Sequence, residues 1–343
     1  MQSVVLGTAA PAEPMSGGCF NGWFLSDTSL SIHATTTGVI KAFNTAGTIV
    51  ATVSPGGYIR RTSNIGTSRV ISPGSTSTTV VESTTLAQLT ILAVYTASDG
   101  VDNSASYAIE DPGTNIMFFQ QYPSPYNFYR YDYVNKVKTH TLALTTKSFT
   151  LLSVGSTVYA MGTHGKILIL SKTNLAQVSF FTLTYSVECG AKDDTAGSAS
   201  IFYNDYGSAA GYVLYKFDTT TQTIQNSIVA HATNQVYSIL SIPSTDALLL
   251  TNRGVNLILF YSKAHPLTRL NGYLNFTLGT TDTIDHRTAV LLPSGSEWYL
   301  STSHNFGGAG LSFVNFYKLG FEPCKVRTTG TVCASCEVGW YLY

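Results

Sequence analysis

The chain of 343 residues is long enough for one large repeat domain or two ordinary ones, and its 44% hydrophobic content argues against disorder. Its 19 basic and 19 acidic residues give a formal net charge of zero, which argues against attraction to nucleic acid or anionic membrane by charge. Charged residues make up only 11% of the chain, so copies of the protein repel one another weakly.

The predicted elements are strands, because short apolar or alternating runs are separated by Gly, Asn, Asp, Ser and Thr clusters. The longest apolar runs, residues 247–250 and 257–261, have the length of strands and are too short to span a membrane. The first predicted strand covers residues 3–7. After it, one unit recurs that consists of an apolar strand, a polar turn and a second strand, at residues 39–53, 127–142, 166–181, 212–224, 256–270 and, truncated, 312–319.

The gap between the first two copies is twice the usual spacing, so a further copy is expected, with residues 89–95 as its apolar strand. That makes about seven units with a period of about 45 residues, although six remains open. A further strand pair precedes several hairpins, so each period holds four strands, as in one propeller blade. We therefore predict an all-β fold, a β-propeller of about seven four-stranded blades over residues 1–320, with the N-terminal strand closing the ring.

The segment from Asp218 to Thr221 resembles the Asp-x-x-Thr turn of several propeller families. The resemblance is one of pattern along residues 3–320 and assigns no subfamily, because no Trp-Asp dipeptide or Gly-Gly kelch signature is present. A large β-sandwich and a β-solenoid remain the alternatives.

The C-terminal segment, residues 321–343, contains Cys324, Cys333 and Cys336, and Gly339-Trp340 follows the Cys-x-x-Cys. This rhythm resembles growth-factor-receptor-type and EGF-like cysteine-rich modules, which occur in protist extracellular surface proteins. The resemblance implies disulfides, the start of a rod-like stalk, and an extracellular or cell-surface location. With five cysteines in total, one disulfide partner is expected beyond the last residue. Zinc binding and thiol redox chemistry are alternatives, but a redox motif needs a βαβ setting that is missing.

Two further cysteines, Cys19 and Cys189, lie within the predicted propeller. They form either a disulfide or two buried, inert thiols. Asn275 begins an Asn-Phe-Thr glycosylation sequon, which supports secretion weakly.

Tyrosines are concentrated in one stretch, and the candidate interface residues are Tyr122, Tyr126, Tyr129, Tyr131 and Tyr133. Aromatic side chains that alternate along a strand place half of them on its outer face, where they suit protein interfaces or carbohydrate stacking. The alternative is that these rings fill the space between blades.

Acidic clusters and catalytic motifs give little support for an enzyme. Asp99-Gly-Val-Asp102-Asn103 resembles a calcium-type loop but is better explained as a hairpin turn, and Asp193-Asp194 is expected in a solvated loop. No catalytic motif, metal site or cofactor is predicted.

We expect a non-catalytic extracellular structural protein whose propeller assembles into a surface filament or coat. Its expected partners are copies of itself, other extracellular proteins or glycans, and the alternative function is a glycan- or ligand-binding adhesive propeller.

Overall fold

The computed structural model describes most of the chain between residues 13 and 342. The residues outside the description are 1–12, 17–18, 26–28, 36–37, 45, 55–62, 66–68, 74–77, 86–87, 96–104, 112, 122–124, 163–164, 207–211, 234, 243–245, 253–256, 265, 276–282, 295–296, 307–310, 320, 323–325, 330–331, 336–340 and 343.

The described strands form seven four-stranded antiparallel sheets, six of them from strands consecutive in sequence. These six are β2 (Cys19–Leu25), β3 (Leu30–Thr35), β4 (Ile40–Phe43) and β5 (Ile49–Val53); β6 (Ser63–Ile65), β7 (Arg69–Pro73), β8 (Thr78–Thr85) and β9 (Gln88–Tyr95); β10 (Ala105–Glu110), β11 (Ile116–Gln121), β12 (Phe128–Asp132) and β13 (Val137–Leu142); β14 (Ser148–Val154), β15 (Thr157–Gly162), β16 (Lys166–Ser171) and β17 (Gln177–Thr182); β18 (Ser186–Lys192), β19 (Ser200–Tyr206), β20 (Tyr212–Asp218) and β21 (Thr223–His231); and β22 (Val236–Ser241), β23 (Ala247–Asn252), β24 (Leu257–Ser262) and β25 (Arg269–Asn275). The remaining sheet joins β26 (Thr283–Ser294), β27 (Glu297–Phe306) and β28 (Leu311–Leu319) to β1 (Glu13–Ser16).

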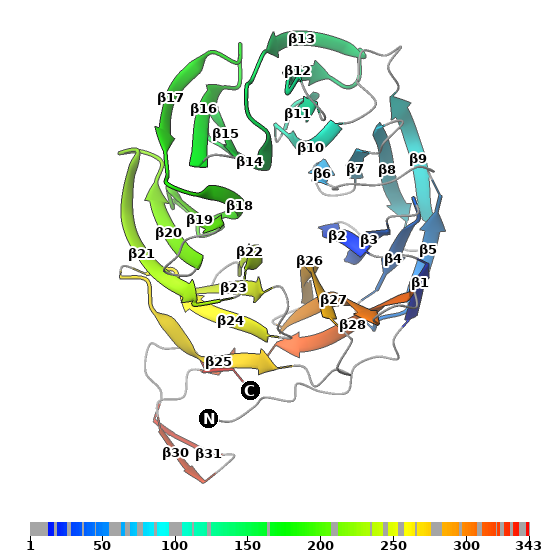
Figure 1. Ribbon diagram of the computed structural model, residues 1–343. Coiled ribbons are helices and arrows are strands. Elements are labelled where there is room, and N and C mark those ends of the chain that lie inside the picture. Colours follow the sequence, from blue (N-terminus) through cyan, green and yellow to red (C-terminus); the bar gives the residue numbers. More distant parts are fainter. Residues whose placement is uncertain are drawn as a thin grey trace.

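The sheets stand around a central axis (Figure 1). In the six consecutive sheets the first strand is innermost and the last is outermost, and in the remaining sheet β26 is innermost and β1 outermost. The prediction of an all-β propeller is therefore confirmed. Because sheets follow one another around the ring, most of them have a neighbour on each face, and apolar side chains fill the space between them. One such cluster, between the β14–β17 and β18–β21 sheets, includes Tyr159, Ile169, Tyr203 and Phe217.

A β-bulge recurs at the same place in the ring. The innermost strand of five sheets has a one-residue register shift against the second strand, as between Val187 and Cys189 or between Ser148 and Thr150. A bulge sharpens the local twist of a strand. Its repetition on the innermost strands fits the tight curvature next to the central axis.

Ring closure is confirmed, but the segment that closes the ring was predicted wrongly. β1 pairs antiparallel with β28, so that Glu13 lies opposite Val314 and Ser16 opposite Leu311. The predicted closing segment, residues 3–7, lies outside the described residues. The short, polar sequence of β1 lacks the apolar run that identified residues 3–7, because an outermost strand needs little apolar surface.

Residues 89–95 were also assigned to the wrong position in their sheet. They belong to β9, which is the outermost strand, and the third strand is β8. β8 has the sequence Thr-Thr-Val-Val-Glu-Ser-Thr-Thr, which is mostly polar and unlike the apolar third strands of the other sheets, whereas the apolar run lies in the next strand, β9.

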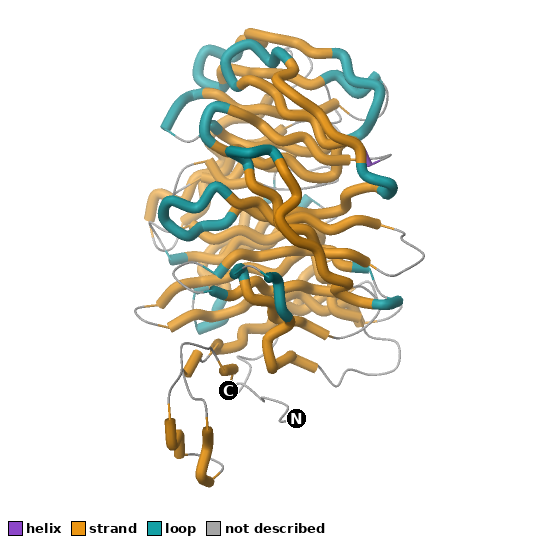
Figure 2. The backbone as a smooth tube through the Cα atoms, turned by 90° about the vertical axis from the view of Figure 1, so that its left-hand side faces the viewer, coloured by secondary structure: helices purple, strands orange, loops and turns teal. Residues whose placement is uncertain are grey.

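The C-terminal segment forms two short pairs outside the seven sheets: β29 (Phe321–Glu322) with β32 (Tyr341–Leu342), and β30 (Val326–Thr329) with β31 (Val332–Ser335). β32 packs beside β25. The β30–β31 hairpin, labelled in Figure 1, lies outside the ring, and Figure 2 shows the same from the side. Cys333 lies in β31, whereas Cys324 and Cys336 are outside the described residues.

Candidate interaction surface on the outer strands

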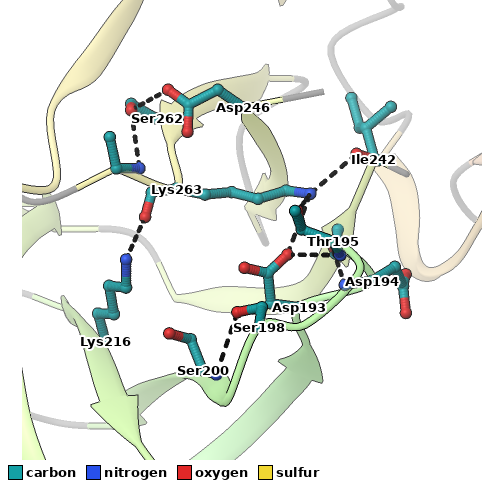
Figure 3. A network of polar contacts seen from close by, with 12 residues as sticks. Asp193, Asp194, Thr195, Ser198, Ser200, Lys216, Ile242, Asp246, Ser262 and Lys263 are labelled. Atoms are coloured by element: carbon teal, nitrogen blue, oxygen red, sulfur yellow. Dashed lines mark hydrogen bonds and ion pairs between the residues drawn. The ribbon is translucent and has the colours of Figure 1, made fainter. Parts of the chain in front are cut away.

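A buried polar network joins the β18–β21 sheet to the β22–β25 sheet (Figure 3). Lys263 follows directly after β24, and its Nζ lies 3.3 Å from Oδ1 of Asp193, which follows β18. The same ammonium group donates hydrogen bonds to the carbonyl of Ile242 at 2.9 Å and to Oγ1 of Thr195 at 3.4 Å. Lys216 of β20 donates to the carbonyl of Lys263 at 2.6 Å. Backbone and side chain of Lys263 therefore both bind the neighbouring sheet.

The Asp193 carboxyl is ionised in this setting. Burial by itself raises its pKa, but hydrogen bonds from Ser198 and Thr195 and the charge of Lys263 together hold the pKa below the ordinary value. The sequence placed Asp193 and Asp194 together in a solvated loop, and this is wrong for Asp193, which is buried, while Asp194 is exposed. The error arises because the countercharge, Lys263, is 70 positions away in the sequence.

The same arrangement joins the β10–β13 sheet to the β14–β17 sheet. Lys172 follows directly after β16, and its Nζ lies 2.7 Å from Oδ1 of Asp111, which follows β10 in the preceding sheet. Nε of Arg130, in β12, donates to the carbonyl of Lys172 at 2.8 Å. In both places a lysine after a third strand reaches an aspartate after the first strand of the preceding sheet.

Two buried amides join the same pairs of sheets at the opposite ends of the strands. Gln120 donates to the carbonyl of Thr146 at 2.9 Å and accepts from the backbone N–H of Ser148 at 2.6 Å. Asn204 donates to the carbonyl of Val236 at 3.2 Å. Both are the fifth residue of a second strand, and the equivalent position in β15 is Met161. Polar contacts at both ends of the strands therefore join the β10–β13 sheet to the β14–β17 sheet and the β18–β21 sheet to the β22–β25 sheet. The contact between the β14–β17 and β18–β21 sheets is mainly apolar.

These networks hold neighbouring sheets together. Each of the two lysines is paired with an aspartate of the preceding sheet, so the contacts give both a structural role. Within the described residues, no group of three or more His, Cys, Asp or Glu is placed to hold a metal ion. Likewise, no helix in the described part of the chain is long and apolar enough to cross a membrane.

Within the described residues, most of the large apolar side chains that are exposed to solvent lie on outermost strands. In β17, Val178 and Phe180 are 55% and 57% exposed, and in β21, Ile224 and Val229 are 46% and 48% exposed. Neither strand contains Lys, Arg, Asp or Glu. Two outermost strands of neighbouring sheets therefore combine an uncharged sequence with exposed apolar side chains.

The tyrosines predicted as interface residues lie elsewhere. Tyr129, Tyr131 and Tyr133 are buried, so the prediction of an outer-face position is wrong for these three. Tyr129 and Tyr131 belong to the third strand of their sheet, both faces of which are covered, and their rings pack against Phe119. Tyr126 is partly exposed, and Tyr122 lies outside the described residues.

The cysteine and glycosylation predictions are resolved only in part. Cys189 is a buried thiol that donates a hydrogen bond from Sγ to Oδ1 of Asn204 at 2.9 Å, so of the two alternatives the disulfide with Cys19 is wrong and the buried thiol holds for Cys189. Cys19 begins β2, and its side chain is outside the description. Asn275 is the last residue of β25, an outermost strand. The calcium-type loop of Asp99 to Asn103 lies outside the described residues.

The sequence contains one signal for the lysine networks. The dipeptide Ser-Lys stands at the end of two third strands, as Ser171-Lys172 and Ser262-Lys263. A cation repeated at one position of a repeat indicates a shared structural role, but its acidic partner is in another repeat and needs the ring to identify it.

Comparison with known proteins shows the fold and no closer relationship. No protein-family model matches the chain, and no curated protein matches it. Among solved structures, U3-55K superposes with a TM-score of 0.72 at 11% identity, covering 92% of this chain and 99% of that one. The WD40 repeats of RRP9 give 0.70 at 11% identity, with 92% and 98% coverage. A chain of the mitotic checkpoint complex gives 0.68 at 13% identity, with 93% and 95% coverage. The chain therefore has a WD40-like propeller fold.

Proposed function

We propose that this chain is a non-catalytic assembly module whose propeller binds protein partners, chiefly copies of itself, through the outer strands. The observation that carries the proposal is the pair of uncharged outer strands β17 and β21 with their exposed Val, Phe and Ile side chains. A protein with zero net charge and few charged residues can associate with itself without strong repulsion.

Rigidity supports the same role. The lysine–aspartate pairs and the buried amides tie two pairs of neighbouring sheets together at both ends, and β17 and β21 belong to these sheets. Strands on sheets that are held in this way lose little conformational entropy when they bind, which favours assembly. The presence of one WD40-like chain in a mitotic checkpoint complex is an example of such a fold within a protein assembly.

We further propose that the assembly is an extracellular surface filament or coat and that residues 321–343 begin a disulfide-rich, EGF-like stalk. The sequence rhythm of Cys324, Cys333 and Cys336 supports this proposal, and glycosylation at Asn275 belongs to the same setting. Glycan binding without polymerisation is the alternative outcome of the test.

The test is sedimentation velocity of the purified chain over a hundredfold range of concentration, followed by electron microscopy with and without reductant. Oligomers that grow with concentration and ordered contacts between rings support self-assembly. A chain that sediments as a monomer throughout, with dispersed single rings on the grids, overturns it, and glycan-binding screens then become the next measurement.

A further inference from the structure

β21 has an unusual combination of features for an outermost strand. It is nine residues long, and among the described strands it pairs with β20 alone. Its other edge therefore directs backbone N–H and C=O groups away from the sheet. Such an edge is a template for a further strand unless charges, proline or a covering segment protect it.

Apart from β17, the other outer strands of the ring carry such a residue or pack beside a strand outside their own sheet. β13 contains Lys138, β1 contains Glu13 and Pro14, and β25 contains Arg269. β25 is also packed beside β32, and β5 and β9 pack against each other. β21 has no Lys, Arg, Asp, Glu or Pro in its nine residues, and β17 shares this composition over six.

The side chains of β21 alternate in exposure in a way that suits a partner. Ile228 and Ala230 pack against the apolar cluster between the β18–β21 and β22–β25 sheets. Ile224, Ser227 and Val229 are exposed. The register shift between Lys216 and Phe217, which lie opposite Asn226 and Ile224, marks a bulge at Gln225. The bulge brings Ile224 onto the same face as Ser227 and Val229.

We infer that β21 pairs antiparallel with β21 of a second copy of this chain about a two-fold axis, joining two four-stranded sheets into one. Ser227 is the central residue of the strand, so the register of greatest overlap places it opposite its own copy. The exposed Ile224 and Val229 then flank the axis on both sides. This inference rests on the proposed function and specifies which edge carries it.

A second copy fits this edge better than a partner of another composition. Two-fold pairing of identical strands is self-complementary, as in the commonest protein dimers. A charged partner strand would lose solvation for its charges against a strand that offers no countercharge. The zero net charge of the chain removes the repulsion that would oppose two copies meeting here.

The first experiment is oxidative cross-linking of Ser227→Cys in the full chain, which has a matched control in the same strand. Directly opposed residues in an antiparallel pair have Cα atoms about 4.5–5.5 Å apart, within the range that a disulfide spans. Ser227→Cys is expected to form a covalent dimer, whereas Thr223→Cys, about four residues from the axis, stays at the background of the unmodified chain.

The second experiment places a charge on the edge. Val229→Lys is expected to weaken self-association at least about tenfold in sedimentation, because each lysine would lie against a partner strand that offers no countercharge. Ala196→Lys, in the exposed turn between β18 and β19, adds the same charge away from the edge and should leave association unchanged. Circular dichroism of both variants, which alter exposed side chains, reports that the ring remains folded.

The outcomes distinguish failure of the β21 pairing from failure of the proposed assembly function. Self-association that persists with no Ser227→Cys dimer above the Thr223→Cys background, or that is equally strong in Val229→Lys, overturns β21 pairing and leaves the assembly function standing. A chain that stays monomeric at all concentrations overturns both.

Discussion

At the scale of single residues, the two lysine–aspartate pairs differ in how completely they are enclosed. The side chains of Lys263 and Asp193 are 4% and 7% exposed, whereas those of Lys172 and Asp111 are 10% and 20% exposed. Removing one member of a buried pair leaves the other charge without compensation, and the cost rises with burial. The two pairs therefore provide an internal comparison between a deeply buried ion pair and a shallower one.

We predict that Lys263→Met lowers the free energy of unfolding by about 3–5 kcal/mol, because Asp193 would remain buried and charged without its lysine. Urea denaturation measures the change. Lys172→Met is the matched control and should cost clearly less. Equal losses in the two variants would contradict the ranking by burial. The double variant Asp193→Leu/Lys263→Met should recover much of the loss, because it removes both charges.

The pKa of Asp193 gives a prediction about pH. Its pKa in the folded protein is below the ordinary value of 3.8, so its ionised form stabilises the fold at higher pH, and this contribution is lost as pH falls through the folded pKa. The difference in free energy of unfolding between the unmodified chain and Asp193→Asn should be constant near neutral pH and shrink below about pH 3.8. A difference that stays constant down to pH 2 would show that the carboxyl is not paired.

At the scale of elements, turns and close approaches fix where strands begin and end. Oδ1 of Asp218 accepts hydrogen bonds from the backbone N–H groups of Thr220 and Thr221 at 2.7 and 3.0 Å, so the Asp-x-x-Thr segment is a turn closed by its aspartate, as the sequence predicted. In the β10–β13 sheet, Asp132 accepts hydrogen bonds in the same way from the backbone N–H groups of Val134 and Asn135.

Gly162 at the end of β15 marks a close approach of two backbone segments. A Cβ at this position would lie 1.9 Å from the carbonyl oxygen of Lys147, which precedes β14. We predict that Gly162→Ala costs more than about 3 kcal/mol, since backbone rather than a flexible side chain would have to move. Gly155→Ala is the control: its φ is +53° with open space around the Cβ, and it should cost only about 1–2 kcal/mol. Thermal unfolding of the two variants compares these costs, and equal melting temperatures would contradict the prediction.

At the scale of the whole molecule, the ring depends on a strand from the far end of the chain. β1 covers the outward edge of β28 and so joins the two ends of the sequence in one sheet. Without it, β28 would present nine residues of open edge, which favours aggregation and removes the contact that holds the ring closed.

We predict that deleting residues 1–16 lowers the melting temperature and causes aggregation on heating, as measured by thermal unfolding with light scattering. A peptide that contains residues 11–18, added in excess, should bind the truncated chain and restore part of the loss, because it supplies β1. A truncated chain that melts like the full one would show that closure contributes little to stability.

The sequence by itself determined the β class, the four-stranded period, the Asp218 turn and the principle of ring closure, because each depends on residues close together in the chain or on their repetition. It could not tell buried from exposed side chains. In a propeller both faces of a sheet are covered by neighbouring sheets, so alternation along a strand does not indicate which side meets solvent. Whether a side chain is buried depends instead on how far its strand lies from the central axis of the ring. Tyr131 in a third strand is buried, while Phe180 in a fourth strand is exposed. The partners of Lys172 and Lys263 were likewise decided only by the tertiary structure, because each pair joins residues from different sheets that the ring brings side by side.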